Sequence, residues 1–250
     1  MSKLAVIGGS ALPTLRGLEV IDEVVVETPY GEPSAPILRG QLEGREVLFL
    51  DRHGRERCTP PHRINYRANV WALHHLGTTH IISGSVVGGI RSDMTAGHFV
   101  FPDQLIDYTY GRANTFFEDE FDFSRHVDFT HPYCPDLHRL LVDAAEELGL
   151  DYTDDATYGV TQGPRFETIA EVKRLERDGC DVVGMTAMPE AALAQEMGIR
   201  YASVAVVGGR AAGRTDGLQA DIEAIRQTIE EGMQTMRELL RYVFLNLGSS

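Results

Sequence analysis

The sequence predicts one α/β domain in which a central sheet is flanked by helices. Short apolar runs that end in glycine or polar residues alternate with stretches whose apolar residues recur at helical spacing, and this alternation is typical of α/β architecture. The chain has 250 residues, enough to enclose one large core. No repeat, low-complexity tract or linker divides it. We therefore assign residues 1–247 to one domain and 248–250 to a tail that is either natural or left over from cloning.

The predicted elements follow the chain in order. Each expected strand is a short apolar run before a turn signal, and these runs lie at residues 4–7, 24–26, 47–50, 80–82, 157–160, 181–185 and 201–207. The expected helices cover residues 65–76, 135–148, 167–178 and 218–244. Pro189 is expected in the first turn of a further helix, where proline is tolerated.

Residues 91–134 are polar but carry many aromatic side chains. Linkers are poor in aromatic residues, so we interpret this segment as a long functional excursion from the domain.

Charge and cysteine content narrow the class of protein. The formal net charge is −14, which argues against nucleic acid or an anionic membrane as a partner. No run of about 18 apolar residues occurs, and the N-terminus does not resemble a signal peptide. The cysteines are scattered, without a CxxC pair, which favours reduced thiols in the cytoplasm; they are Cys58, Cys134 and Cys180. The histidines show no metal-binding spacing, so we expect no metal.

Four predicted strands end in small or polar residues that suit an anion. Ligands of open α/β sheets bind beyond the carboxyl ends of the strands, where backbone N–H groups and hydroxyls can reach a phosphate. An arginine adds a planar fork for two oxygens. The resulting candidate phosphate cage consists of Ser10, Arg52, His53, Ser85 and Thr186.

Taken alone, each residue of that cage has a more ordinary interpretation than phosphate binding. Gly8-Gly9-Ser10 is more often a plain turn, Arg52 a surface ion pair, and His53 a packed or solvated side chain. The chain contains neither GxxxxGK[ST] nor GxGxxG after its first strand, so a P-loop and a dinucleotide fold are unsupported. Spacing alone does not show that the four strand ends converge.

Longer strings identify a family resemblance. Arg52-His53-Gly54-Arg55, Pro60-Pro61 and the string at 64–69 closely resemble the methylthioadenosine phosphorylases, a family of purine nucleoside phosphorylases. The strings at 163–168 and 183–191 resemble the same family, as do those at 7–10 and 27–34. The match covers nearly the whole chain in the right order.

The resemblance implies a nucleoside phosphorylase fold, which is one α/β domain with a mixed, partly closed sheet, assembled as a homotrimer. It implies catalysis by Ser10, Arg52, His53 and Thr186. It implies that phosphate is held by these residues together with Ser85 and the Val86 backbone. It places the nucleoside near Phe166, Val183, Gly184 and Met185, and it places His126 where a neighbouring subunit helps to close the 5′ pocket.

The implied reaction is phosphorolysis of a 5′-methylthio purine nucleoside in purine and methionine salvage. The glycosidic bond stretches, the ribose gains oxocarbenium character, and phosphate held below C1′ stabilises and then captures that cation. A hydrogen bond at purine N7 stabilises the leaving base. Inorganic phosphate is the co-substrate, and no cofactor or metal is required.

Two positions depart from the family pattern. Arg57 stands where the family usually has a histidine, and Gly209 stands where adenine-specific members have an aspartate and 6-oxopurine members tend to have an asparagine. The Gly209 backbone, a water or Asp216 is expected to take over that role. The Ala211-Ala212-Gly213 context favours methylthioinosine over methylthioadenosine by a narrow margin.

Three other functions are compatible with parts of the sequence. A general inosine or guanosine phosphorylase differs in accepting a 5′-hydroxyl group. A nucleoside hydrolase would need no phosphate, which the intact cage argues against. A non-catalytic nucleoside-binding protein is suggested only by the missing acid at Gly209.

Overall fold

The computed structural model describes residues 3–8, 18–42, 44–56, 58–119, 122–214 and 222–247. Within them the strands are β1 (Leu4–Gly8), β2 (Leu18–Val24), β3 (Ile37–Leu42), β4 (Arg45–Asp51), β5 (His80–Gly89), β6 (Phe99–Asp107), β7 (Tyr152–Val160), β8 (Val182–Gly184) and β9 (Arg200–Arg210). The α-helices are α1 (Tyr66–His75), α2 (Pro135–Glu147), α3 (Ile169–Arg177), α4 (Ala187–Glu196) and α5 (Ile222–Asn246). Short 3-10 turns cover Pro61–Arg63 and Phe123–Arg125.

All of these strands belong to one mixed sheet with the order β2-β3-β4-β1-β5-β8-β7-β6-β9. β1 lies parallel to both β4 and β5, whereas β2, β3 and β4 form antiparallel pairs. β5 also pairs in parallel with β9, and β9 pairs with β6. The strands β5, β8, β7, β6 and β9 therefore close into a ring, and β2 to β1 extend from it as an open sheet. The predicted α/β class with a mixed, partly closed sheet is confirmed.

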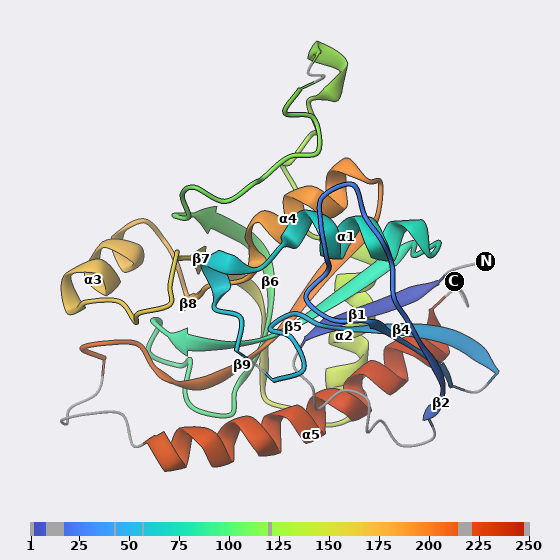
Figure 1. Cartoon of the computed structure of the whole chain (residues 1–250). Helices are drawn as coiled ribbons and strands as arrows, with labels where there is room; N and C mark the ends of the chain where they lie inside the picture. Colours follow the sequence, from blue (N-terminus) through green and yellow to red (C-terminus); the bar gives the residue numbers. More distant parts are fainter. Residues whose placement is uncertain are drawn as a thin grey trace.

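Helices cover both faces of the sheet. α1 and α4 lie together on one face, and α2 and α5 lie on the other, as Figure 1 shows. β1 shows why two cores form: Ala5 and Ile7 contribute to the cluster beneath α1 and α4, while Leu4 and Val6 contribute to the cluster beneath α2 and α5. Successive side chains of a strand point to opposite faces, so a wholly apolar strand supplies both cores.

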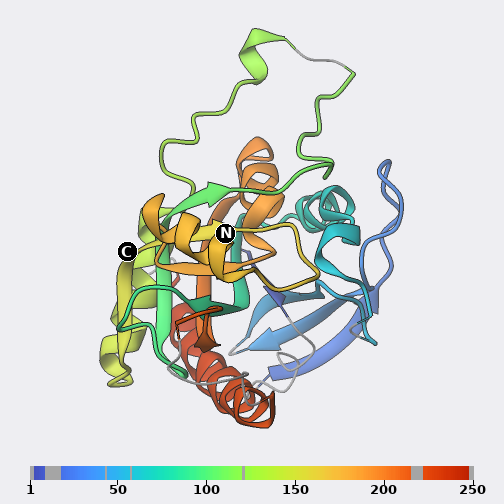
Figure 2. The same ribbon diagram turned by 90° about the vertical axis from the view of Figure 1, so that its left-hand side faces the viewer.

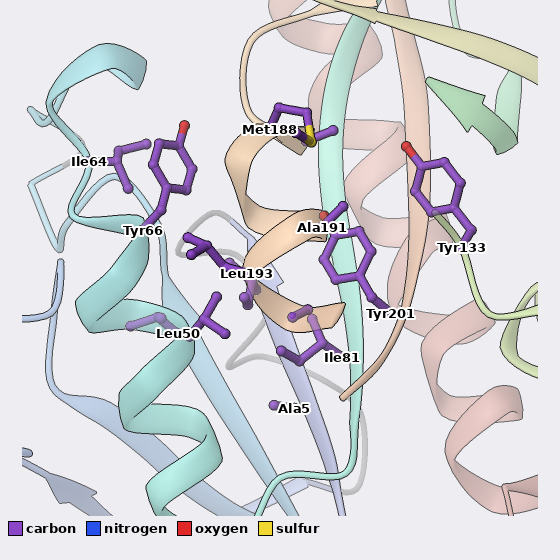
Figure 3. Close-up of a cluster of buried hydrophobic side chains, with 14 of the residues drawn as sticks. Ala5, Leu50, Ile64, Tyr66, Ile81, Tyr133, Met188, Ala191, Leu193 and Tyr201 are labelled. Carbon is purple, nitrogen blue, oxygen red and sulfur yellow. The ribbon is translucent and has the colours of Figure 1, made fainter. Parts of the chain in front are cut away.

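The core beneath α1 and α4 lies next to the candidate site. In Figure 3, Leu193 of α4 points toward Leu50 and Tyr66, while Tyr201 and Tyr133 lie beyond Ala191 on the other side of that helix. A third, smaller cluster forms beneath α3 around Val172 and Leu175.

Local capping explains where the predicted helices begin. The Asn65 side chain accepts a hydrogen bond from the Ala68 N–H at the start of α1, which satisfies one of the unpaired donors of the first turn. Thr168 and Glu171 form a reciprocal capping box at the start of α3. Pro135 occupies the first turn of α2, where the missing N–H is not needed.

Several predicted bounds were wrong, and polar or proline residues account for them. Of the strand expected at 24–26, only Val24 belongs to a strand: it is the last residue of β2, which begins at Leu18 and is mostly exposed, so its sequence lacks an apolar pattern. β3 was not predicted. The excursion predicted at 91–134 wrongly includes β6, because Pro102 interrupts the apolar run of that strand. The strand register shifts at this proline, as expected for a bulge. The excursion therefore covers residues 108–134, and it projects from the domain in Figures 1 and 2.

No helix in the described ranges is long and apolar enough to cross a membrane. The proposed tail at 248–250 lies outside the described residues.

Leu141 tests the packing of α2 against α5. Its side chain is fully buried in the core beneath these helices, so Leu141→Ala is expected to lower the free energy of unfolding by about 2–5 kcal/mol. Leu148 follows the same helix and is exposed, so Leu148→Ala is the matched control and should change stability by about 0.5 kcal/mol at most. Urea unfolding followed by circular dichroism measures both, and equal losses would contradict the described packing.

Candidate active site

The candidate site lies where β1, β4 and β5 reach the same level of the sheet. Ile7 of β1 is level with Leu50 of β4 and Ser83 of β5. Arg52 follows β4, and its N–H donates to the Gly8 carbonyl at 3.0 Å. The ends of β1 and β4 therefore lie beside Ser83 in the middle of β5, whereas Ser10 lies outside the described residues.

Arg52 is buried and paired with a carboxylate that the sequence analysis did not single out. Its side chain is 2 % exposed, and that of Glu190 in α4 is 0 % exposed. Arg52 Nε donates to Glu190 Oε2 at 2.7 Å, and Nη2 donates to Glu190 Oε1 at 2.9 Å. Burial lowers the pKa of Arg52, but the adjacent Glu190 carboxylate raises it by more. Arg52 is therefore charged, and its planar fork binds Glu190.

Two further groups complete the network around Glu190. Ser83 Oγ donates to Glu190 Oε1 at 2.8 Å and accepts from Arg52 Nη2 at 2.6 Å. Tyr201 Oη of β9 donates to the same carboxylate oxygen at 2.9 Å. A buried ion pair is tolerated when such hydrogen bonds satisfy its remaining polar atoms. The network therefore joins β4, β5, β9 and α4 at one point.

This pairing limits what Arg52 can offer to a phosphate. Arg52 Nη1 donates to the Gly84 carbonyl at 3.1 Å, and one further Nη1 hydrogen has no partner among the described residues. Arg52 can therefore give one N–H to an anion, while its charge is balanced by Glu190. A phosphate at this site needs donors from elsewhere, and its contact with Arg52 stays a prediction.

A cluster of hydroxyl groups lies beside the network and is formed by Ser85, Tyr158 and Thr186. Ser85 Oγ and Tyr158 Oη are buried and have no hydrogen-bond partner within the described part of the chain. Thr186 precedes α4, but its hydroxyl does not cap that helix. Burial raises the pKa of Tyr158, and the neighbouring Ser85 hydroxyl lowers it by less, so the phenol stays protonated. The cluster offers hydroxyl donors to an anion.

His53 is held in one tautomer. Its Nδ1 lies 2.9 Å from the Thr59 carbonyl, and because a carbonyl only accepts, Nδ1 carries the hydrogen. Burial lowers the pKa of His53, so the ring is neutral at pH 7. Its Nε2 is then a hydrogen-bond acceptor, suited to the proton of a hydrogen phosphate rather than to a bare phosphate oxygen.

The predicted nucleoside-binding positions lie on neighbouring strand ends. Gly88 of β5 pairs with Val183 of β8 and with Gly209 of β9. Gly184 packs against the phenol of Tyr158, since a Cβ atom at Gly184 would lie 2.2 Å from Tyr158 Oη. Val183, Gly184 and Gly209 are therefore brought together next to the hydroxyl cluster.

Other predicted positions lie around this centre or away from it. The Met185 side chain packs against Gly163, at the start of the loop that carries Phe166. Phe166 is 85 % exposed, and Val86 is also exposed. His126 lies in the excursion, edge-on to the Phe123 ring. The roles predicted for these residues stay predictions.

Asp216 and Arg57 lie outside the described residues.

The sequence analysis did not predict Glu190 or Tyr158 as site residues. Glu190 carried a usable signal, because it is the one carboxylate inside the apolar run Ala187-Met188-Pro189-Glu190-Ala191-Ala192-Leu193-Ala194, and such a group needs a buried partner.

Comparison with known proteins agrees with this geometry. A family profile described as "Phosphorylase superfamily" matches residues 3–244. A "Probable S-methyl-5'-thioinosine phosphorylase" from Pseudomonas syringae pv. tomato is 46 % identical over 243 residues, covering 97 % of this chain and 98 % of the relative. A "6-oxopurine nucleoside phosphorylase" from Pyrococcus furiosus is 47 % identical over 218 residues, covering 85 % of this chain and 81 % of the relative.

A solved structure shares the whole fold. The methylthioadenosine phosphorylase from Schistosoma mansoni in complex with adenine superposes with a TM-score of 0.93 at 29 % identity, covering 100 % of this chain and 93 % of that one. The chain therefore belongs to the phosphorylase superfamily, and its fold is that of the nucleoside phosphorylases. It is an enzyme of the pentosyltransferase type, as the family resemblance predicted.

Glu190 is expected to be essential for stability. Glu190→Gln keeps the volume of the side chain but leaves the Arg52 charge buried without a counter-charge. The free energy of unfolding should therefore fall by about 3–5 kcal/mol. Asp22 pairs with Arg39 on the surface, and Asp22→Asn should leave stability nearly unchanged because exposed ion pairs contribute little. Urea unfolding of both variants measures the difference. A loss for Glu190→Gln as small as that for Asp22→Asn would show that the buried pair is dispensable.

Tyr158 is expected to contribute a donor to phosphate. Tyr158→Phe removes only the buried hydroxyl beside Ser85, and the KM for phosphate should rise roughly tenfold, as for the loss of one hydrogen bond to a charged group. Tyr133 is also buried, with a hydroxyl that has no hydrogen-bond partner in the described ranges, but it stacks on Tyr201 and, unlike Tyr158, does not interact with Ser85 or Thr186. Tyr133→Phe is therefore the control. Equal phosphate KM values for the two variants would remove Tyr158 from the phosphate site.

Proposed function

We propose that the enzyme splits the 5′-methylthio nucleoside of a 6-oxopurine with inorganic phosphate. The substrate is methylthioinosine, and the products are hypoxanthine and 5-methylthioribose 1-phosphate, in a salvage reaction of the cytoplasm. Relatives named S-methyl-5′-thioinosine phosphorylase align over nearly the full length of both chains, which supports the 5′-methylthio group. Phosphate is the co-substrate, and we expect no metal or cofactor.

The base preference rests on one observation, the position of Glu167. Thr161 Oγ1 donates to Glu167 Oε1 at 2.6 Å and lies 3.3 Å from the Gly184 carbonyl. This hydroxyl therefore links the Glu167 carboxylate to the end of β8. The segment after β9 approaches the same loop, because a Cβ atom at Gly213 would lie 2.9 Å from the Ile169 side chain.

A carboxylate at this place discriminates between the two purines. An ionised carboxylate only accepts hydrogen bonds. The six-membered ring of hypoxanthine carries a hydrogen on N1 and can donate it, whereas N1 of adenine is itself an acceptor. Two acceptors that face each other without water between them are costly, so a half-buried Glu167 that faces N1 would favour the 6-oxopurine. This argument agrees with the preference expected from the Ala211-Ala212-Gly213 context.

Each of the site residues has a separate role in the proposed reaction. The hydroxyls of Ser85, Tyr158 and Thr186 would hold phosphate below C1′, and the remaining Arg52 N–H would bind one of its oxygens. Neutral His53 would accept the phosphate proton through Nε2. This arrangement positions the nucleophile against the developing ribosyl cation, which is the main source of catalysis in such a displacement. Asp216 remains the proposed hydrogen-bond donor to N7.

We also propose that the enzyme is a homotrimer in which the excursion of one subunit closes the 5′ pocket of the next. The excursion projects from the domain in both views, and it carries Phe123 with 87 % of its side chain exposed next to His126. A large apolar group on a projecting segment is typical of an interface. Light scattering at micromolar concentration should give three times the mass of the chain.

A substrate comparison tests the function. Methylthioinosine, methylthioadenosine and inosine are assayed side by side with and without phosphate. We expect turnover only with phosphate, and the largest kcat/KM for methylthioinosine. Turnover without phosphate would indicate a hydrolase, and equal kcat/KM for inosine would indicate a general 6-oxopurine nucleoside phosphorylase. The absence of all turnover would indicate a binding protein.

Glu167→Leu tests the base reader. Loss of the carboxylate should lower kcat/KM for methylthioinosine by about 100-fold, because an unpaired N1–H is then buried. The loss for methylthioadenosine should be at least about tenfold smaller, so the ratio of the two substrates is the internal control. A variant that loses activity equally on both substrates would exclude Glu167 from base selection.

A further inference from the structure

Arg112, in the loop after β6, donates hydrogen bonds to the turn that joins β8 to α4. Its Nη1 lies 2.9 Å from the Met185 carbonyl and 2.5 Å from the Met188 carbonyl. The same nitrogen lies 3.2 Å from Tyr66 Oη at the start of α1. Thr186, the predicted phosphate ligand, lies between the two carbonyls that Arg112 holds.

The other edge of the guanidinium holds the loop between β7 and α3. Arg112 Nη2 donates to the carbonyls of Thr161 at 3.2 Å and Gln162 at 2.8 Å. Arg112 Nε donates to Gln162 Oε1 at 3.2 Å, and that oxygen also accepts from the Tyr110 N–H at 3.1 Å. Thr161 is the residue whose hydroxyl holds Glu167. One side chain therefore links the phosphate side of the site to the base side.

The β8–α4 turn needs such an outside donor. Met188 has φ −116° and ψ 138°, so the first turn of α4 is not helical there. The N–H four residues after Met185 would be that of Pro189, and proline has no N–H. The Met185 carbonyl therefore lacks the partner that a regular helical turn would give it, and buried carbonyls require a partner. Arg112 supplies it.

We propose that Arg112 is a positioning residue for phosphorolysis: it fixes the Met185–Thr186 backbone, and through it the Thr186 hydroxyl, against phosphate and ribose. This inference rests on the proposed function, in which Thr186 binds phosphate and Met185 lies at the ribose. Arg112 acts through these residues and not by contact with the reacting atoms.

The geometry requires an arginine. The acceptors lie around both edges of a plane, and a guanidinium presents five N–H donors in fixed directions. Arg112 also lies over the Tyr66 ring, with 5.4 Å between Cζ and the ring centroid. A lysine has three donors on a single nitrogen and cannot reach both sets of carbonyls together.

The test removes the guanidinium and then returns it. Arg112→Ala should lower kcat/KM by about 100-fold, the usual consequence of a misplaced catalytic group, and should raise the KM for phosphate. Added guanidinium ion at millimolar concentration should restore at least about a tenth of the lost activity by filling the same place, since it carries the same donors. Arg112→Lys should stay at least about tenfold below the wild type.

Arg174 on α3 is the matched control. It also lies over an aromatic ring, that of Tyr108, at 5.3 Å, and it faces Asp178 at 3.5 Å, but its side chain is exposed and its ion pair lies at the end of α3 rather than at the β8–α4 turn. Arg174→Ala should leave kcat and both KM values unchanged, and guanidinium should have no effect on it.

A crystal structure of Arg112→Ala separates this inference from the proposed function. We expect a displaced Met185–Thr186 backbone in an otherwise intact domain. An unchanged backbone, unchanged kinetics, or an activity loss that guanidinium does not rescue would each overturn the role of Arg112. A wild-type enzyme without phosphorolysis would instead refute the proposed function, and the backbone position in the variant would still decide whether Arg112 holds the turn.

Discussion

The rest of the site depends on the buried ion pair between Arg52 and Glu190. Two charges in a core are costly to desolvate. They are tolerated here because the hydroxyls of Ser83 and Tyr201 donate further hydrogen bonds to the carboxylate. Arg52 directly follows β4, and the other three residues come from β5, α4 and β9. Their hydrogen bonds join these elements beside Ser85 of β5 and Thr186 at the start of α4.

The network also changes how an acidic protein can bind an anion. With a formal net charge of −14, long-range attraction for phosphate is weak. The arginine expected to supply a cation is neutralised locally by Glu190. Binding must therefore come from short-range hydroxyl and N–H donors, and those of Arg52, Thr186 and Tyr158 are buried, which strengthens hydrogen bonds to an anion.

The alternation of apolar runs was enough to predict the α/β class, because β1 and most of β5 and β9 are buried on both faces and are therefore rich in apolar residues. β2 and β6 could not be predicted in the same way: one is exposed, and the other contains Pro102. For the site, Arg52 after β4 and Ser85 were found from local pattern, although Ser85 lies within β5 and not at its end. Tyr158 and Arg112 act through contacts with residues far along the chain, which no local pattern reveals. Glu190 also pairs with a distant residue, Arg52, and its place in an apolar run signals a buried partner without identifying it.

The closed ring of strands also constrains how the chain can fold during its synthesis. β5 needs β9 as its parallel neighbour, and β9 begins at Arg200, so a nascent chain carries an unpaired β5 edge while more than a hundred further residues are made. Such edges invite pairing with other chains, and contacts of this sequence separation form slowly. During synthesis, this edge is where a chaperone would protect the protein best.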